Sequence, residues 1–112
     1  MKIAVVGSRD FKDAEFLEEK LEPYLPKIAL LISGGAQGAD KLAERWARKH
    51  KIPTEIFLPD HKRYKHAFHH RDRLIAERAE IVIAFWKNRS SGTKYTIHYA
   101  RKIGRQVVVH SV

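Results

Sequence analysis

The sequence predicts an α/β fold in which a five-stranded parallel sheet lies between two layers of helices. Its 112 residues contain five apolar runs rich in β-branched residues, and these runs are nearly continuous, as expected of strands buried on both faces. Segments with helical spacing of their apolar residues separate the runs, so strands and helices alternate. The length fits one domain with one core. We therefore expect a single three-layer, Rossmann-like sandwich over residues 1–112, with helices on both faces of the sheet and strand order 3-2-1-4-5.

The strands are expected where the apolar runs lie, at Ile3–Val6, Ile28–Ile32, Thr54–Leu58, Ile81–Phe85 and Val107–Val109. Between the first two runs, Asp13 can cap a helix with one apolar face, which Pro23 interrupts late and Pro26 ends. This first helix is expected to carry Leu25 on its apolar face.

Three further helices complete the alternation. The second is expected from about Gly38 to His50, where four apolar residues form one inward stripe. The third, about Ala67 to Arg78, is polar except for a narrow apolar stripe. The fourth, about Gly92 to Ile103, ends at Gly104, the residue type that best adopts the left-handed conformation after a helix.

The composition excludes several classes of protein. Without cysteine the chain has no disulfide and no thiolate metal site. No apolar run approaches the roughly 18 residues of a membrane span, and the apolar start is too short for a signal peptide, so we expect a cytoplasmic protein. The formal net charge of +9 favours encounters with polyanions, although a solvated basic surface also explains it. Abundant charge with few Asn and Gln residues fits a thermophilic source.

Small or donor-rich residues follow the first, second and fourth predicted strands. Ligands of such sheets bind at the carboxyl ends of the strands where the strand order reverses, so these loops should meet at one cleft. Glycine allows close approach of the backbone, and a helix that begins just afterwards offers free N–H groups to a phosphate. The pattern Gly34-Gly35 followed by Gly38 matches neither the Walker loop nor the full dinucleotide fingerprint, so tight turns without a ligand are an alternative. The candidate phosphate-binding residues are Gly7, Ser8, Arg9, Ser33, Gly34, Gly35, Ala36, Gly38, Asp40, Arg71, Trp86, Ser90, Ser91, Gly92 and Thr93.

Four of these candidates have side chains with a specific expected role. Arg9 and Arg71 are expected near the phosphate, because a guanidinium group matches phosphate oxygens with two parallel hydrogen bonds. Asp40 either accepts a ribose hydroxyl or complements the dipole of the second helix. Trp86 either stacks on a base or belongs to the partly buried core.

The segment from Asp60 to Arg73 is dense in histidine and positive charge. His66, His69 and His70 have helical spacing, but no acidic residue or cysteine completes a metal site and the neighbouring cations would repel a metal. We therefore expect no metal, and we interpret residues 61–73 as a basic rim for an anionic ligand or a nucleic acid strand.

On these motifs the chain resembles the SLOG superfamily, specifically its small YspA-like, YpsA-related group of Rossmann-like proteins. The resemblance covers nearly the whole chain, and four segments carry it: Val6–Phe11, Ile32–Asp40, Ala84–Trp86 and Ser91–Thr93. It implies binding or sensing of a nucleotide or a nucleotide derivative, without a certain cofactor. We also expect a homo-oligomer, with a dimer favoured.

A resemblance to LOG-type nucleoside monophosphate phosphoribohydrolases leaves an enzyme as one alternative. In that family a catalytic glutamate follows three residues after the threonine of a Gly-Thr motif. Counted from Thr93, this position is Thr96, which has no carboxylate, so hydrolysis by that mechanism is not expected. Another acid would have to act, and Asp40, Asp72 and Glu77 are the nearby candidates.

The second alternative is a single-stranded nucleic-acid-binding protein. The chain is similar to the DNA-processing protein A family, which binds single-stranded DNA, in Gly7–Arg9, Ser33–Ala36, Arg71–Ala76 and Ser91-Gly92. Asp72 lies where related proteins carry asparagine between two arginines, which puts a negative charge among the cations.

Overall fold

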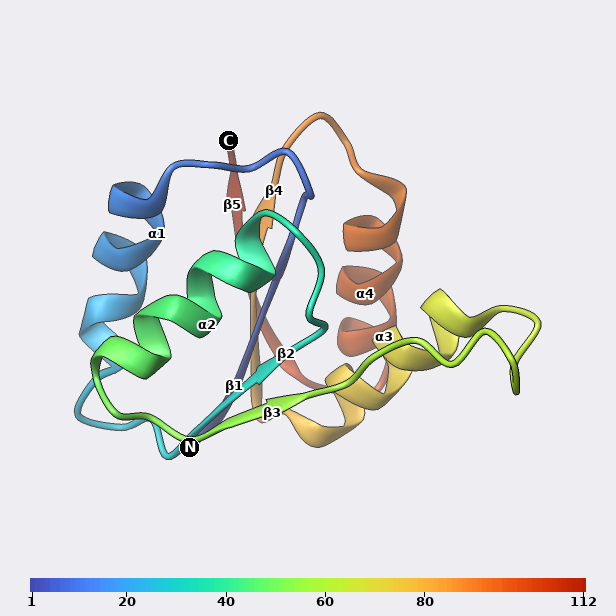
Figure 1. Ribbon diagram of the computed structural model, residues 1–112, viewed down its shortest axis with the longest axis horizontal. Helices are drawn as coiled ribbons and strands as arrows, with labels where there is room; N and C mark the ends of the chain where they lie inside the picture. The colour runs from blue at the N-terminus through green and yellow to red at the C-terminus, as the bar shows by residue number, and fades with distance from the viewer.

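The computed structural model describes residues 1–112 and contains one five-stranded sheet between two layers of helices (Figure 1). All strands are parallel and lie in the order β3-β2-β1-β4-β5. They are β1 (Lys2–Gly7), β2 (Leu30–Ser33), β3 (Thr54–Ile56), β4 (Ile81–Trp86) and β5 (Gln106–Ser111). The predicted fold class and strand order are confirmed.

Four α-helices connect the strands and divide between the two faces of the sheet. The first face is covered by α1 (Ala14–Leu21) and α2 (Ala39–Lys49), and the second by α3 (Ala67–Arg78) and α4 (Ser91–Lys102) (Figure 1). Asp13 caps α1 by accepting a hydrogen bond from the Phe16 N–H at 3.0 Å. None of the helices is both long enough and apolar enough to cross a membrane.

The central strands are buried on both faces and supply two separate cores, so the prediction of a single core was wrong. In β1, Ile3 and Val5 belong to the core under α1 and α2, whereas Ala4 and Val6 belong to the core under α3 and α4. Both faces of such a strand need apolar residues, which explains the continuous apolar runs in the sequence.

Two strands, β2 and β3, are shorter than predicted because a strand needs a neighbour to pair with. Pairing between β2 and the first residue of β1 begins at Leu30, so the strand does not include Ile28. Similarly, β3 ends at Ile56 because β2, its neighbour, ends opposite it at Ser33. Leu58 therefore lies beyond the sheet and is 69% exposed.

The first helix is shorter than predicted and the last strand is longer. Pro23 has no N–H to donate, so the chain tightens after Leu21 into a 3₁₀ turn, Glu22–Tyr24, and the helix does not reach Leu25. The last strand extends past Val107–Val109 on both sides, because β4 offers it a pairing partner along its whole length.

Candidate functional site

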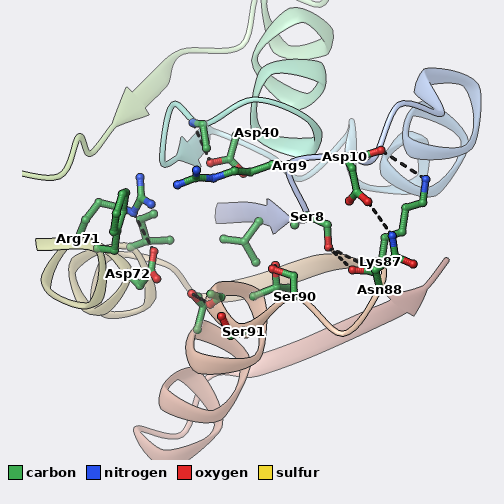
Figure 2. Close-up of a pocket in the computed structure, with 18 of the residues that line it drawn as sticks. Ser8, Arg9, Asp10, Asp40, Arg71, Asp72, Lys87, Asn88, Ser90 and Ser91 are labelled. Carbon is green, nitrogen blue, oxygen red and sulfur yellow. Dashed lines mark hydrogen bonds and ion pairs between the residues drawn. The ribbon is translucent and has the colours of Figure 1, made fainter. Parts of the chain in front are cut away.

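A cleft of about 510 Å³ opens at the carboxyl ends of β1 and β4, where the strand order reverses (Figure 2). This is the edge of the sheet at which the sequence predicts the ligand site. The loop after β1, the β4–α4 loop and the starts of α3 and α4 form its walls. Its lining residues are Val6, Gly7, Ser8, Arg9, Asp10, Ala36, Asp40, Phe68, His69, Arg71, Asp72, Ile75, Lys87, Asn88, Ser90, Ser91, Gly92, Thr93 and Thr96.

Ser8 joins the two loops that follow β1 and β4. Its hydroxyl donates a hydrogen bond to the Lys87 carbonyl and accepts one from the Lys87 N–H, both at 2.8 Å. The Asn88 side chain adds a second link between the same loops by donating to the Asp10 carboxylate at 2.7 Å. Ser8 is 1% exposed and its hydroxyl makes both of these hydrogen bonds within the protein. Its role is therefore to hold the two loops together and so to stabilise the shape of the cleft.

Ser8→Ala is expected to lower the free energy of unfolding by about 1–3 kcal/mol, because the partly buried backbone N–H and carbonyl of Lys87 each lose a hydrogen bond. Equilibrium urea unfolding measures this loss. Ser90→Ala is the control, since the Ser90 hydroxyl bonds only the Thr93 hydroxyl, at 3.3 Å, and should cost less. Equal losses in the two variants would contradict the bridging role of Ser8.

The loop between β2 and α2 already uses several of its N–H groups within the chain. The pairs are Gly35 N–H to Ser33 Oγ at 3.2 Å, Ala36 N–H to Asp40 Oδ2 at 3.2 Å, and Ala39 N–H to the Ser8 carbonyl at 3.4 Å. The Ser33 hydroxyl in turn donates to Glu44 of α2 at 2.6 Å. These hydrogen bonds hold the turn in place, and the N–H groups that make them are not available to a ligand.

Arg71 lines the cleft, but its guanidinium group is largely committed to the fold. Its Nε donates to Asp72 Oδ1 at 2.8 Å, and its Nη1 donates to the Gly34 carbonyl at 2.6 Å. The Arg71 and Asp72 side chains are only 9% and 10% exposed. Arg71 therefore ties α3 to the β2–α2 loop, and Asp72 balances its charge instead of standing as an isolated negative charge.

Asp40 is a buried acid at the edge of the cleft. It is 5% exposed, and burial raises its pKa from 3.8 to about 7, although the Ala36 N–H and the charge of Arg71 both act to lower it. Burial also raises the pKa of Asp72, against the opposing effect of Arg71. With a pKa of about 7, Asp40 is only partly ionised near neutral pH, so it adds less than a full negative charge to the cleft.

The start of α4 offers unpaired N–H groups to the cleft. The Ser90 side chain makes no capping hydrogen bond, and the N–H groups of Ser91, Gly92 and Thr93 have no partner within the chain. Arg9 lies on the opposite wall (Figure 2). Its guanidinium carbon is 5.3 Å from the Phe68 ring centroid, and it takes part in none of the four ion pairs of the chain. A positive helix end facing an uncompensated arginine is suited to an anion.

Most of the predicted site residues line the cleft: Gly7, Ser8, Arg9, Ala36, Asp40, Arg71, Ser90, Ser91, Gly92 and Thr93. Gly34 and Gly35 instead line a neighbouring cavity of about 360 Å³ beside Leu58. Ser33 points inward to Glu44. Gly38 packs against the backbone of the loop after β1.

Trp86 also lies outside the cleft lining. Its indole N–H donates to the Ser90 carbonyl at 3.0 Å, and its ring packs against the core under α3 and α4. Trp86 was predicted either to stack on a base or to belong to the partly buried core, and the structure places it in the partly buried core.

Three polar residues of the cleft were not among the predicted ligand-site residues: Asp10, Lys87 and Asn88. Phe68 and His69 also line the cleft, and both lie within the basic rim expected over residues 61–73. One signal was available, because Lys87 and Asn88 come two and three residues after the predicted strand Ile81–Phe85, at the ligand edge of the sheet. Asn88 also has a φ of 54°, a left-handed conformation that asparagine tolerates. The positions of Phe68 and His69 depend on how α3 packs, which the sequence pattern does not determine.

The residues considered for hydrolysis divide between the cleft and the outer surface. Thr96 lines the cleft with 2% exposure, and its hydroxyl donates to the Gly92 carbonyl at 3.1 Å. Asp40 and Asp72 also line the cleft, whereas Glu77 lies outside it and accepts a hydrogen bond from Tyr99. Nowhere do three or more histidine or carboxylate side chains come close enough together to hold a metal ion.

Two family models match the chain, each over more than half of its length, and their ranges overlap at residues 41–64. The model of the YspA, cpYpsA-related SLOG family matches residues 1–64, and the model of DNA recombination-mediator protein A matches residues 41–112. Gene 61 protein of Mycobacterium phage D29 is 27% identical over 117 residues, which cover 96% of this chain and 94% of that protein.

Three solved structures share the fold. DNA processing protein A from Streptococcus pneumoniae superposes with a TM-score of 0.82 and 25% identity over 96% of this chain, which spans only 49% of that protein. The protein TM1055 gives a TM-score of 0.73 with 22% identity, covering 95% of this chain and 71% of its own. DNA processing protein A from Helicobacter pylori gives a TM-score of 0.70 with 19% identity, and the match covers 97% of this chain and 64% of that protein.

Proposed function

Because the chain belongs to the YspA, cpYpsA-related SLOG family and its residues 41–112 match the model of DNA recombination-mediator protein A, we propose that it binds single-stranded nucleic acid. The cleft is the proposed site for one phosphate group of the strand. The solved structure of the Helicobacter pylori relative concerns single-stranded DNA binding by that protein, and the shared fold supports the same class of ligand here.

The observation that carries this proposal is the arrangement of Arg9 opposite the start of α4. Arg9 can donate two parallel hydrogen bonds to a phosphate, and the free N–H groups of Ser91, Gly92 and Thr93 can donate from the other side. The small side chains there leave room for the phosphate oxygens. The net charge of +9 adds a long-range attraction for a polyanion.

A free nucleotide is the second candidate ligand. The cleft volume of about 510 Å³ lies within the range of roughly 300–1,000 Å³ that is typical of small-molecule sites. The same phosphate contacts would serve a nucleotide that is not part of a strand. The two candidates differ in whether affinity increases with the length of the strand.

Arg9→Gln is expected to weaken binding of a labelled oligothymidylate about tenfold, because one charged contact to phosphate is lost. It should also reduce the slope of log K against log salt by about one unit. Fluorescence anisotropy over a salt series measures both quantities. Arg48→Gln is the matched control: it removes the same charge from the exposed last turn of α2, at the other edge of the sheet, and should change affinity less than about twofold.

Three outcomes would change the proposed site or the proposed ligand. Equal weakening by Arg9→Gln and Arg48→Gln would mean that overall charge, and not the cleft, determines binding. Affinity that does not respond to salt, or no binding at low salt, would overturn the proposal of a nucleic acid ligand. Mononucleotides that bind as tightly as oligomers would favour the second candidate.

A further inference from the structure

Helices α3 and α4 lie side by side on one face of the sheet (Figure 1). A row of aromatic rings from these two helices leads away from the cleft. His69 of α3 lines the cleft and stacks on Tyr95 of α4, with ring centroids 4.0 Å apart and planes 11° from parallel. Tyr99 lies one helical turn further along α4, with its ring 6.4 Å from that of Tyr95 and 9° from parallel. We call His69, Tyr95 and Tyr99 the aromatic seam.

Two hydrogen bonds from α3 fix the tyrosines of the aromatic seam. Arg73 donates to the Tyr95 hydroxyl at 2.9 Å, and the Tyr99 hydroxyl donates to Glu77 at 2.5 Å. His69, Arg73 and Glu77 are spaced four residues apart, so they form one stripe of α3 that faces the two tyrosines. Rings held in this way lose little conformational freedom when a ligand binds them.

The aromatic seam forms the outer rim of the helical layer. Ile75, Ile97 and Ala100 supply the fully buried contacts beneath α3 and α4, and Tyr99 packs only at the margin of this core. Both tyrosines are half-buried and His69 is exposed, so parts of all three rings face solvent. Aliphatic residues therefore close the core, and the rings remain accessible to a partner.

The surface beside the aromatic seam is positively charged. Helix α4 (Ser91–Lys102) carries Lys94, Arg101 and Lys102 and has no acidic residue. On α3, Arg73 lies against Tyr95, and Glu77 already accepts a hydrogen bond from the Tyr99 hydroxyl. Aromatic rings flanked by cations suit single-stranded nucleic acid, whose unpaired bases stack on rings while its phosphates attract lysine and arginine. An acidic protein segment would satisfy the cations but would not use the ring faces.

We infer that the aromatic seam is a base-stacking track, along which a single strand continues from the phosphate in the cleft and places its next bases on Tyr95 and Tyr99. This inference rests on the proposed function. The cleft supplies a phosphate contact that any nucleotide can make, and the aromatic seam supplies the additional affinity for a strand.

The double variant Tyr95→Leu/Tyr99→Leu tests the track, because leucine removes both rings but keeps apolar bulk and a high helix propensity. Fluorescence anisotropy compares oligothymidylates of about 2 and about 12 nucleotides, with circular dichroism as the check on folding. Affinity for the longer strand should fall at least about tenfold, whereas affinity for the shorter one should stay within about twofold of the wild type. Tyr95→Phe/Tyr99→Phe keeps the rings but loses the hydrogen bonds that fix them, so it should bind both strands within about threefold of the wild type.

Each outcome separates the track from the proposed function. If the wild type binds the longer strand and the leucine variant binds it equally well, the track is wrong and the proposed function stands. If the wild type binds no strand, both are wrong. Equal weakening in the phenylalanine variant would show that the hydroxyl groups, and not the rings, matter. Competition by polyglutamate as strong as that by a strand of equal charge would also overturn base stacking.

A cross-linking experiment on the wild type decides the question even if the leucine variant does not fold. A strand that carries 5-iodouracil should form photo-cross-links to Tyr95 or Tyr99, identified by mass spectrometry of peptides. Cross-links found only in other parts of the chain would overturn the track.

Discussion

Gly38→Ala is expected to lower the free energy of unfolding by about 3 kcal/mol or more and the Tm by about 15 °C. Gly38 precedes α2 with φ +80° and ψ −129°, a conformation that is nearly restricted to glycine. A Cβ atom there would lie 2.3 Å from the Ser8 carbonyl oxygen and 2.6 Å from that of Arg9. Both oxygens belong to the backbone of the cleft, so no side-chain rotation relieves the clash. Thermal and urea unfolding measure the loss.

Two other glycines separate the causes of this effect. Gly104 has φ +84° but open space around a Cβ, so Gly104→Ala should cost about 1–2 kcal/mol from backbone strain alone. Gly92 has open space and no positive φ, and Gly92→Ala should leave stability unchanged or raise it by up to about 1 kcal/mol. If Gly38→Ala were no less stable than Gly104→Ala, the close approach of the two backbones would not matter for stability.

The arrangement of the sheet could be predicted because it follows from patterns within each segment. Continuous apolar runs such as Ile81–Phe85 indicate strands buried on both faces, and the helices between them require parallel strands. The ends of the elements were less predictable, since they depend on neighbours. The length of β3, for example, is set by where β2 stops at Ser33, which no local pattern around Thr54–Ile56 reveals.

The position of the candidate site was also predictable, but the roles of its glycines were not. Glycine in a loop after a strand indicates close approach to the backbone without showing what approaches. A Cβ atom on Gly7 would lie 2.5 Å from the Phe85 carbonyl oxygen and 2.6 Å from the Ala39 Cβ. Close packing within the protein therefore explains this glycine. The space beside Gly92 is open. Arg71 has two partners, the adjacent Asp72 and the carbonyl of Gly34 in a distant loop, and only the fold brings Gly34 near.

Asp40 should make the protein less stable as the pH rises from about 4 to about 7. Burial raises the pKa of its carboxyl group in the folded protein to about 7, from 3.8 in the unfolded chain. Between these values the folded protein holds a proton that the unfolded chain has lost, so a rise in pH favours unfolding. A pKa difference of about three units corresponds to a loss of at most about 4 kcal/mol.

Asp40→Asn should remove this part of the pH dependence, because the amide oxygen can still accept from the Ala36 N–H but does not titrate. Relative to the wild type, the variant should therefore gain up to about 4 kcal/mol between pH about 4 and pH about 8. Urea unfolding of both proteins at several pH values measures the difference. The raised pKa of Asp72 acts in the same direction in both proteins, so its contribution largely cancels. A stability difference independent of pH would mean that Asp40 stays ionised throughout.

The same carboxyl group should link pH to ligand binding, because Asp40 lines the cleft proposed for a phosphate. A bound phosphate disfavours a second negative charge nearby, so binding should keep Asp40 protonated and take up protons near pH 7. Affinity for an oligothymidylate should then decrease as the pH rises above about 7, by up to about tenfold per pH unit, in the wild type. A phosphodiester does not change its charge in this range, so the dependence reports on the protein. His69 also lines the cleft and is unchanged in Asp40→Asn, so a flat profile in that variant would assign the effect to Asp40, whereas equal profiles in the two proteins would exclude it.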